Sequence, residues 1–436
     1  MKKLLKVIMS MFKEEKLQEF QDIEIKDVVM DSKKVQEGSL FLAINNGNKY
    51  IQEALNKGAA IVIGDKVPEE INDKRVITVE NTIEIMQKLA REYRRELALK
   101  VIGITGSNGK TTTKDLITGV LSEKYITEKT QGNYNNHIGL PYTILTLPGN
   151  TEVVVLEMGM SSFGEIDTLC KIAEPNYGII TNIGDSHLEF LKTRENVFKA
   201  KGEMIKYISS DKLFIFGDDP YLKNVSGIKV GYLEENDYKI NIISEELSAT
   251  EFTVNNFEKY KISLNGKHNC INATMAIGIG KAFGLTMEEI QRGLEKSQMT
   301  AMRFEKKLVG ETLYINDAYN ASPTSMEYSL MTFDNLKVSK KKIAILGDML
   351  ELGEESVKFH KEILEKAIET KIDKIFLYGP LMAQGAQLVK NNNIYTFETK
   401  NDIVKALREE KEPIAVLLKG SRGMKLEEII EQKEQK

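Results

Sequence analysis

Short, fully apolar runs alternate with segments of helical periodicity along most of the chain. In the middle of the sequence such runs lie at Val101–Ile104, Val153–Leu156, Gly178–Ile183 and Leu213–Phe216. Strands in which every residue is apolar belong to a sheet that is covered on both faces, and such sheets are typically parallel. The pattern therefore predicts a central α/β domain built on a largely parallel sheet.

The same alternation appears on both sides of this middle stretch. Before it, the apolar runs Leu40–Ile44 and Ala59–Gly64 enclose a predicted helix. After it, the runs Ile343–Leu346, Ile375–Tyr378 and Ile414–Leu418 alternate with helices and indicate a second parallel sheet. We predict an α/β fold of three domains: a small N-terminal α/β domain (1–98), a central domain (99–303) and a C-terminal Rossmann-like domain (304–436).

The central domain opens with a glycine-rich junction between an apolar run and a predicted helix, Thr105-Gly106-Ser107-Asn108-Gly109-Lys110-Thr111-Thr112. Such a loop directs backbone N–H groups and a helix N-terminus at one spot, which suits a polyphosphate. Lys110 would reach the β- and γ-phosphates, and the Thr111 hydroxyl would ligate Mg²⁺. Ile104 stands where the strict Walker pattern has glycine, and an ordinary glycine-rich turn is the alternative. We interpret the junction as a P-loop that binds a nucleoside triphosphate.

Net charge and cysteine content exclude several classes of function. The chain has 436 residues and a formal net charge of −4, so nothing indicates a nucleic acid or an anionic membrane as partner. Cys170 and Cys270 lie in apolar stretches without metal-ligand spacing, which favours buried thiols and a reducing compartment. The first residues fit an amphipathic helix better than a signal peptide, and no segment approaches a membrane span. We expect a soluble, cytoplasmic monomer.

Three polar side chains follow predicted strands of the central domain. Glu157 ends the strand Val153–Leu156, where a carboxylate is well placed to hold Mg²⁺, although it could instead cap the next helix. His187 follows the next strand, and because Mg²⁺ prefers oxygen ligands, the residues alone favour a hydrogen-bonding role over a metal-ligand role. Lys201 lies on a helix beyond it and could be an ordinary surface lysine. Their roles stay open on the residues alone.

Together these segments resemble the Mur ligase family, the ATP-dependent amide ligases that build the peptide of bacterial cell-wall precursors. The resemblance spans nearly the whole chain. It rests on the P-loop and on four further segments: Glu157–Met160, Asn182–His187, Lys267–Ala273 and Asp317–Pro323.

The resemblance implies a set of site residues. ATP would be bound by the P-loop residues and by His268, Asn269, Asn272, Arg303 and Asp317. Mg²⁺ would be ligated by Thr111, Glu157 and His187. The catalytic residues would be Lys110, Glu157, His187 and Lys201. Lys201 matches a lysine that CO₂ carbamylates, which would turn it into a long carboxylate able to hold a second Mg²⁺; Lys199 is the neighbouring alternative. Asn269 could also be a simple helix N-cap.

Within the family, the chain most resembles ligases that join D-alanyl-D-alanine to a UDP-N-acetylmuramoyl tripeptide. Side-chain amides can bind a sugar–peptide, although Asn also favours turns, and an arginine can grip a carboxylate. The Asn-Pro-Arg signature of the diaminopimelate-adding ligase is absent. Two departures affect the uridine segment: Lys33 replaces a common arginine, and Asn46-Gly47-Asn48 replaces Asp-Gly-His. The substrate-binding candidates are Asp31 and Ser32 in the uridine segment, Asn133, Asn135 and Asn136 in an asparagine cluster, Asp348 in Leu346–Gly353, and Arg422 in Lys419–Gly423.

The implied reaction proceeds through an acyl phosphate of the tripeptide, as a step of peptidoglycan synthesis. The competing hypotheses are a folylpolyglutamate-type ligase of the same fold, a P-loop motor or switch, and a non-catalytic nucleotide-binding scaffold. Neither an arginine finger nor a coupling surface is evident in the sequence, which argues against the motor. The sequence leaves open whether the third residue of the tripeptide is lysine or diaminopimelate.

Overall fold

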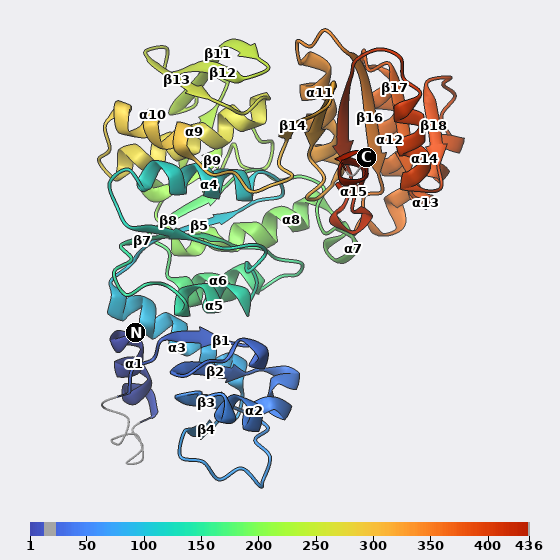
Figure 1. Cartoon of the computed structure of the whole chain (residues 1–436). Helices are drawn as coiled ribbons and strands as arrows, with labels where there is room; N and C mark the ends of the chain where they lie inside the picture. The colour runs from blue at the N-terminus through green and yellow to red at the C-terminus, as the bar shows by residue number, and fades with distance from the viewer. Residues whose placement is uncertain (13–22, 435–436) are drawn as a thin grey trace. The chain divides into compact units, whose positions relative to one another are not determined.

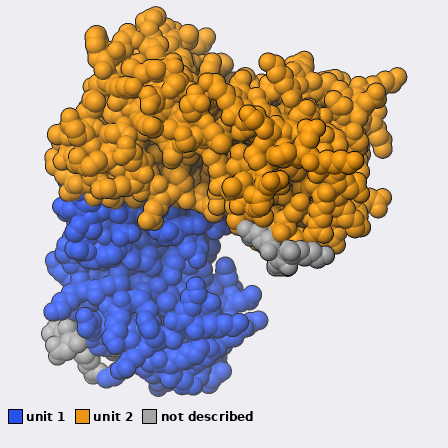
Figure 2. Space-filling model, turned by 45° about the horizontal axis from the view of Figure 1, so that its top comes forward, with its two compact units in different colours: residues 1–104, 125–178, 203–208 blue, residues 105–124, 179–202, 209–436 orange. Residues whose placement is uncertain are grey.

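The computed structural model describes residues 1–12 and 23–434 (Figure 1). The chain divides into two compact units, shown in different colours in Figure 2. Unit 1 comprises residues 1–104, 125–178 and 203–208, and unit 2 comprises residues 105–124, 179–202 and 209–436. Within the described ranges, no helix combines the length and the apolar character needed to cross a bilayer.

Unit 1 begins with an amphipathic helix and a small parallel sheet. Helix α1 (Lys2–Phe12) buries one apolar face, as its pattern predicts. Strands β1 (Asp27–Val29), β2 (Ser39–Ala43), β3 (Ile61–Gly64) and β4 (Val76–Thr78) pair in sequence order, all parallel. Helix α2 (Ile51–Asn56) joins β2 to β3 and packs on one core cluster with them. The predicted N-terminal α/β arrangement is confirmed.

The rest of unit 1 carries the first strands of the central region. Helix α3 (Thr82–Leu97) starts at an Asn81 cap and ends at Ala98, whose φ of 55° stops the helix. Strands β5 (Lys100–Thr105), β7 (Val153–Glu157) and β6 (Thr127–Lys129) pair in parallel in that order. Helices α5 (Gly139–Leu145) and α6 (Glu165–Ala173) complete this part. Glu157 is the last residue of β7, at the carboxyl end of the strand.

Unit 2 contains the helix that follows the P-loop, α4 (Lys110–Leu121), together with α9 (Lys267–Ala282) and α10 (Met287–Lys296). Nearly every residue of α9 is buried, because its small side chains allow neighbouring elements to approach on all sides. Strands β9 (Leu213–Phe216) and β10 (Ile228–Gly231) are parallel, whereas β11 (Tyr238–Glu246), β12 (Ala249–Val254) and β13 (Glu258–Ile262) form an antiparallel meander. Strand β8 (Tyr177–Ile180) leads to α7 (Leu188–Leu191) and α8 (Arg194–Lys201).

The C-terminal part of unit 2 is a six-stranded sheet. Its strands, in the order β14-β15-β19-β16-β17-β18, are parallel except for β14. They span Glu305–Val309, Thr312–Asn316, Ile414–Lys419, Lys341–Gly347, Lys374–Tyr378 and Ile394–Phe397 in that order.

Both faces of this sheet are covered, since alternate residues of one strand enter different cores. Ala344 and Leu346 pack with α11 (Pro323–Asn335), α12 (Ser356–Ile368) and α13 (Pro380–Gln387). Ile343 and Ile345 pack with α14 (Lys400–Arg408) and α15 (Glu428–Glu434). This arrangement confirms the predicted Rossmann-like class, while the exact residue boundaries of the three domains stay a prediction.

Candidate active site

The P-loop forms a tight turn between β5 and α4. Gly106 and Gly109 have φ values of +142° and +82°, which L-residues rarely adopt. A Cβ atom on Gly109 would lie 2.7 Å from Oδ1 of Asn272. Gly109 is also the N-cap of α4, so the loop passes directly into the helix N-terminus. This geometry is that of an anion-binding turn.

The segment after β8 holds the loop in place through reciprocal hydrogen bonds. Asn182 accepts from the backbone N–H groups of Ser107 and Asn108, at 3.0 Å each, through its carbonyl and its Oδ1. Its Nδ2 donates back to the carbonyl of Asn108 at 3.0 Å, and Thr181 Oγ1 donates to the same carbonyl at 2.5 Å. The Gly184 N–H donates to Ser107 Oγ at 2.9 Å. The cradle is therefore fixed from outside, over a sequence separation that local patterning does not reveal.

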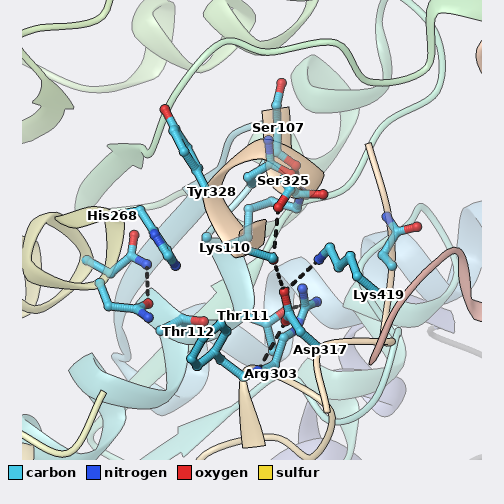
Figure 3. A pocket seen from close by; sticks show the side chains of 17 residues that line it. Ser107, Lys110, Thr111, Thr112, His268, Arg303, Asp317, Ser325, Tyr328 and Lys419 are labelled. Atoms are coloured by element: carbon cyan, nitrogen blue, oxygen red, sulfur yellow. Dashed lines mark hydrogen bonds and ion pairs between the residues drawn. The ribbon is translucent and has the colours of Figure 1, made fainter. Parts of the chain in front are cut away.

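A pocket opens in front of the loop, with side chains from α4, α9, α11, the 302–304 segment and the ends of β15 and β19 (Figure 3). Lys110 Nζ donates to the Gly106 carbonyl at 2.7 Å, and Arg303 Nη2 donates to Thr111 Oγ1 at 3.0 Å. Two buried donors in this pocket, Arg303 Nε and Asn108 Nδ2, have no hydrogen-bond partner within the described part of the chain. Because a buried unpaired donor is costly, these two N–H groups indicate a place for an anionic ligand.

Asp317 and Lys419 form a buried ion pair at the pocket wall. Lys419 Nζ lies 2.8 Å from Asp317 Oδ2, and Ser329 Oγ donates to the same oxygen. The Phe304 N–H donates to Oδ1 at 3.1 Å. Burial lowers the pKa of Lys419, and the neighbouring carboxylate partly offsets this. Lys419 is not among the residues predicted from the sequence, although its place at the carboxyl end of the apolar strand β19 is a signal for a site residue.

The first turns of α9 present an amide chain to the pocket. Asn269 donates to the Asn265 carbonyl at 2.7 Å, and Asn272 Nδ2 donates to Asn269 Oδ1 at 3.2 Å. Thr113 Oγ1 in turn donates to Asn272 Oδ1 at 3.2 Å. The helix is capped at Gly266, so the alternative interpretation of Asn269 as the N-cap is wrong.

His268 lies beside these amides and stacks on Tyr328 of α11. The ring centroids are 5.4 Å apart and the planes differ by 4°. Desolvation lowers the pKa of His268 to about 4, against an opposing effect of Asp317. The imidazole is therefore neutral at physiological pH. Tyr328 was not among the sequence-predicted residues.

The two candidate lysines of α8 differ in their surroundings. Lys201 is 1% exposed, and desolvation together with the charge of Lys110 lowers its pKa well below the usual value. Lys199 is exposed and lies 3.7 Å from Glu195, one turn earlier. The surface interpretation therefore describes Lys199 and is wrong for Lys201.

Glu157 and His187, the other metal candidates, each contact a polar neighbour. Glu157 is buried, and its Oε1 accepts from Asn135 Nδ2 at 3.1 Å. It does not cap the following helix, which begins at Glu165 behind Gly164. His187 has a φ of 54°, and its Nδ1 lies 2.9 Å from Glu351 Oε2. Over residues 1–12 and 23–434, no group of three or more His, Cys, Asp or Glu side chains gathers as a metal cluster.

A second pocket of unit 2 lies between the P-loop and the loops that follow β16 and β19. Lys110, His187, Glu351 and Arg422 all line it. The Arg422 side chain is about half exposed and pairs with Glu427. This pocket therefore brings a predicted phosphate-binding lysine and a predicted carboxylate-binding arginine to one cavity.

Asp348 lies at the start of this region but faces inward. It is 2% exposed, and its carboxylate accepts from the N–H groups of Leu381 and Met382 at 3.2 and 2.8 Å. These bonds stabilise the N-terminus of α13. A direct substrate contact by Asp348 stays a prediction. Its two hydrogen bonds to α13 stabilise the fold.

The remaining substrate candidates lie in unit 1. Asp31 caps the short 3₁₀ helix Ser32–Lys34, in which Ser32 is buried. Asn136 accepts from the Ile138 and Gly139 N–H groups at the start of α5, at 3.1 and 2.8 Å, which is the turn role that Asn favours. Asn133 is exposed. Of the asparagine cluster, Asn135 alone binds another predicted site residue, Glu157.

Two family models match the chain. The Mur ligase middle domain matches residues 104–280, and the Mur ligase, glutamate ligase domain matches residues 302–422. A UDP-N-acetylmuramoyl-tripeptide--D-alanyl-D-alanine ligase of Bacillus subtilis is 41% identical over 428 residues, covering 94% of each chain. The ligase of the same name from Rickettsia prowazekii is 31% identical and covers 94% of this chain and 95% of its own.

Solved structures of MurF proteins are also similar to this chain. The crystal structure of MurF from Acinetobacter baumannii superposes with a TM-score of 0.86 at 27% identity, covering 94% of both chains. MurF ligase from Thermotoga maritima, solved in complex with ADP, superposes with a TM-score of 0.84 at 31% identity, covering 95% of this chain and 98% of that one.

Proposed function

The chain belongs to the Mur ligase family, and we propose that it joins D-alanyl-D-alanine to a UDP-N-acetylmuramoyl tripeptide with cleavage of ATP to ADP and phosphate. This is a step of peptidoglycan precursor synthesis. Support comes from relatives of that name that match over nearly the full length. The observation that carries the proposal is the pocket that Lys110 and Arg422 line together. A monomeric state and a cytoplasmic location stay predictions from the sequence.

The P-loop pocket is proposed to bind ATP, as the ADP complex of the Thermotoga maritima neighbour supports. The unpaired N–H groups of Arg303 and Asn108 suit phosphate oxygens. Asp317 is an acceptor and would repel phosphate, so its natural partner on ATP is a ribose hydroxyl. Neutral His268 and the Asn269–Asn272 amides suit the adenine ring and its polar edge.

The second pocket, which Lys110 and Arg422 line together, supports acyl transfer. The terminal carboxylate oxygen of the tripeptide attacks the γ-phosphorus and ADP leaves, which creates a carbonyl with a good leaving group. The free amine of the dipeptide then attacks this carbonyl carbon, phosphate departs, and the amine nitrogen loses a proton. Lys110 would offset the negative charge that accumulates between the two anions, and Arg422 would hold the dipeptide carboxylate.

Mg²⁺ fits the donors that the chain offers. The candidate ligands are the Thr111 hydroxyl, the Glu157 carboxylate and the His187 imidazole. Each is proposed on its own chemistry. Mg²⁺ is often held by one or two protein carboxylates and keeps phosphate and water ligands. When bound, Mg²⁺ neutralises phosphate charge.

Lys201 is proposed as the carbamylated lysine. Carbamylation requires an uncharged amine, because the nitrogen lone pair must attack CO₂. The buried position of Lys201 and its lowered pKa both favour that neutral form. Exposed Lys199 lacks this environment.

The function is tested by phosphate release with matched substrates. We expect release to require a UDP-N-acetylmuramoyl tripeptide and D-alanyl-D-alanine together, and single amino acids to fail. Running the lysine- and diaminopimelate-containing tripeptides in parallel decides the third residue. Lys110→Ala should abolish turnover, whereas exposed Lys199→Ala serves as its control.

Two outcomes would contradict the proposal. Efficient ligation of free lysine or diaminopimelate to a dipeptide precursor would move the chain to a sister ligase. Steady ATP hydrolysis that no amine stimulates would favour a P-loop hydrolase instead.

A further inference from the structure

Lys419 is a buried cation that has no part in the proposed transfer steps. It is the last residue of β19, its side chain is 4% exposed, and it lines the nucleotide pocket together with Lys110 and Arg303. Its ion-pair partner is Asp317, 102 residues away in sequence. A cation placed so deep costs desolvation energy, so a surface role does not explain it.

Lys419 occupies one acceptor position of the Asp317 carboxylate. A carboxylate has about four acceptor positions. Oδ2 accepts from Lys419 and Ser329, and Oδ1 accepts from the Phe304 N–H. One acceptor position therefore remains, on Oδ1, and the carboxylate cannot rotate without breaking its bond to Lys419.

The same carboxylate supports a strained segment. Met302 and Phe304 have φ values of 60° and 55°, in the left-handed region that non-glycine residues rarely adopt. Arg303 lies between them and reaches Thr111 Oγ1 at 3.0 Å. The Phe304 N–H bond to Asp317 is one of the contacts that hold this segment in its conformation.

We propose that Lys419 is a positioning residue for ATP: its ammonium fixes the Asp317 carboxylate so that Oδ1 offers one lone pair to a ribose hydroxyl while it holds the segment that presents Arg303. This rests on the proposed function and on the ribose contact assigned to Asp317. In this role Lys419 acts on the nucleotide through Asp317. Its effect is therefore on ribose selection more than on the transfer step.

The test compares ATP with 2′-deoxy-ATP and 3′-deoxy-ATP in the complete ligation assay. Wild type should prefer ATP over at least one of the analogues. Lys419→Met keeps the length and packing but removes the charge; we expect the KM for ATP to rise about 10- to 100-fold, as for loss of a charge-assisted hydrogen bond, and the ribose preference to fall to about one. The fall in kcat should be smaller than the rise in KM.

Lys341→Met is the matched control. Lys341 is also a strand lysine of this sheet and is paired with a carboxylate, Glu410 at 2.8 Å, but it does not line the nucleotide pocket. Its KM and ribose preference should match wild type. Ser329→Ala removes the other donor to Oδ2 and keeps the charge, so it should lower the preference partially even if Lys419→Met does not fold.

The inference fails if Lys419→Met or Ser329→Ala keeps the full wild-type preference, or if Lys341→Met loses it equally. It also fails if the wild type makes no distinction between ATP and both deoxy analogues. A wild type without any amine-dependent phosphate release would instead overturn the proposed function, so the two failures are distinguishable.

Discussion

Replacing Gly109 by alanine perturbs the P-loop and the α9 amides at once. At its φ of +82° an L-residue costs about 1–2 kcal/mol. The new Cβ atom would lie 2.7 Å from Asn272 Oδ1, so the Asn272 side chain must move and lose its bonds to Thr113 and Asn269. At about 0.5–1.5 kcal/mol per bond, these add about 1–3 kcal/mol. We expect the free energy of unfolding to fall by about 2–5 kcal/mol in total.

Gly284→Ala separates the two contributions. Gly284 lies in the same unit with a φ of +72°, and a Cβ there would meet only the Nζ atom of Lys124, at an ordinary contact distance of 3.8 Å. It should therefore show the backbone cost alone, about 1–2 kcal/mol. Urea denaturation of both variants measures the difference, and ADP titration should show weaker binding for Gly109→Ala only. Equal destabilisation of the two variants, with unchanged ADP affinity, would refute the reasoning.

Three further expectations concern single residues. Lys201→Ala should be nearly inactive, recover partly with added short carboxylates, and lose a ¹³CO₂-derived carbamate signal; a signal that disappears in Lys199→Ala instead would contradict this. Arg422→Ala should raise the KM for the dipeptide far more than that for ATP, and an equal rise in both would speak against the clamp. Because the folded-state pKa of His268 is about 4, below its unfolded value, the unfolded chain binds the proton first and stability is lost as the pH falls from about 6.5 towards 4. His268→Asn should flatten this limb of the urea midpoint against pH, and an unchanged slope would disprove it.

The sequence predicted those features that depend on neighbouring residues. The strands appeared as fully apolar runs because both faces of their sheets are covered, and the P-loop appeared because its glycines and α4 adjoin. The alternative interpretation of Asn269 as a helix cap is wrong, because Gly266, three residues earlier, is the N-cap of α9. Glu157 is too far from α6 to cap it, because the helix begins only at Glu165; the length of this loop could not be predicted from the sequence.

The contacts that complete the site are long-range and lack a local signature. Asn182 grips the P-loop from 74 residues away, and Lys419 reaches Asp317 across 102. The burial of Lys201 likewise depends on the folded surroundings, since its sequence neighbours are those of an ordinary amphipathic helix. Lysines in different surroundings, such as Lys199 and Lys201, are therefore distinguished only by the fold.

The charges of the nucleotide pocket contrast with those of the whole molecule. The chain carries a formal net charge of −4, yet the acidic and basic side chains that line the pocket are three bases, Lys110, Arg303 and Lys419, and one acid, Asp317. An anionic nucleotide is thus attracted locally by a protein that repels it at a distance, and salt screens the distant part first, since the Debye length is about 8 Å at physiological ionic strength. The field that draws ATP in also retards the departure of ADP. Turnover should consequently pass through a maximum as ionic strength rises, with slow arrival limiting at one end and weak retention of ATP at the other.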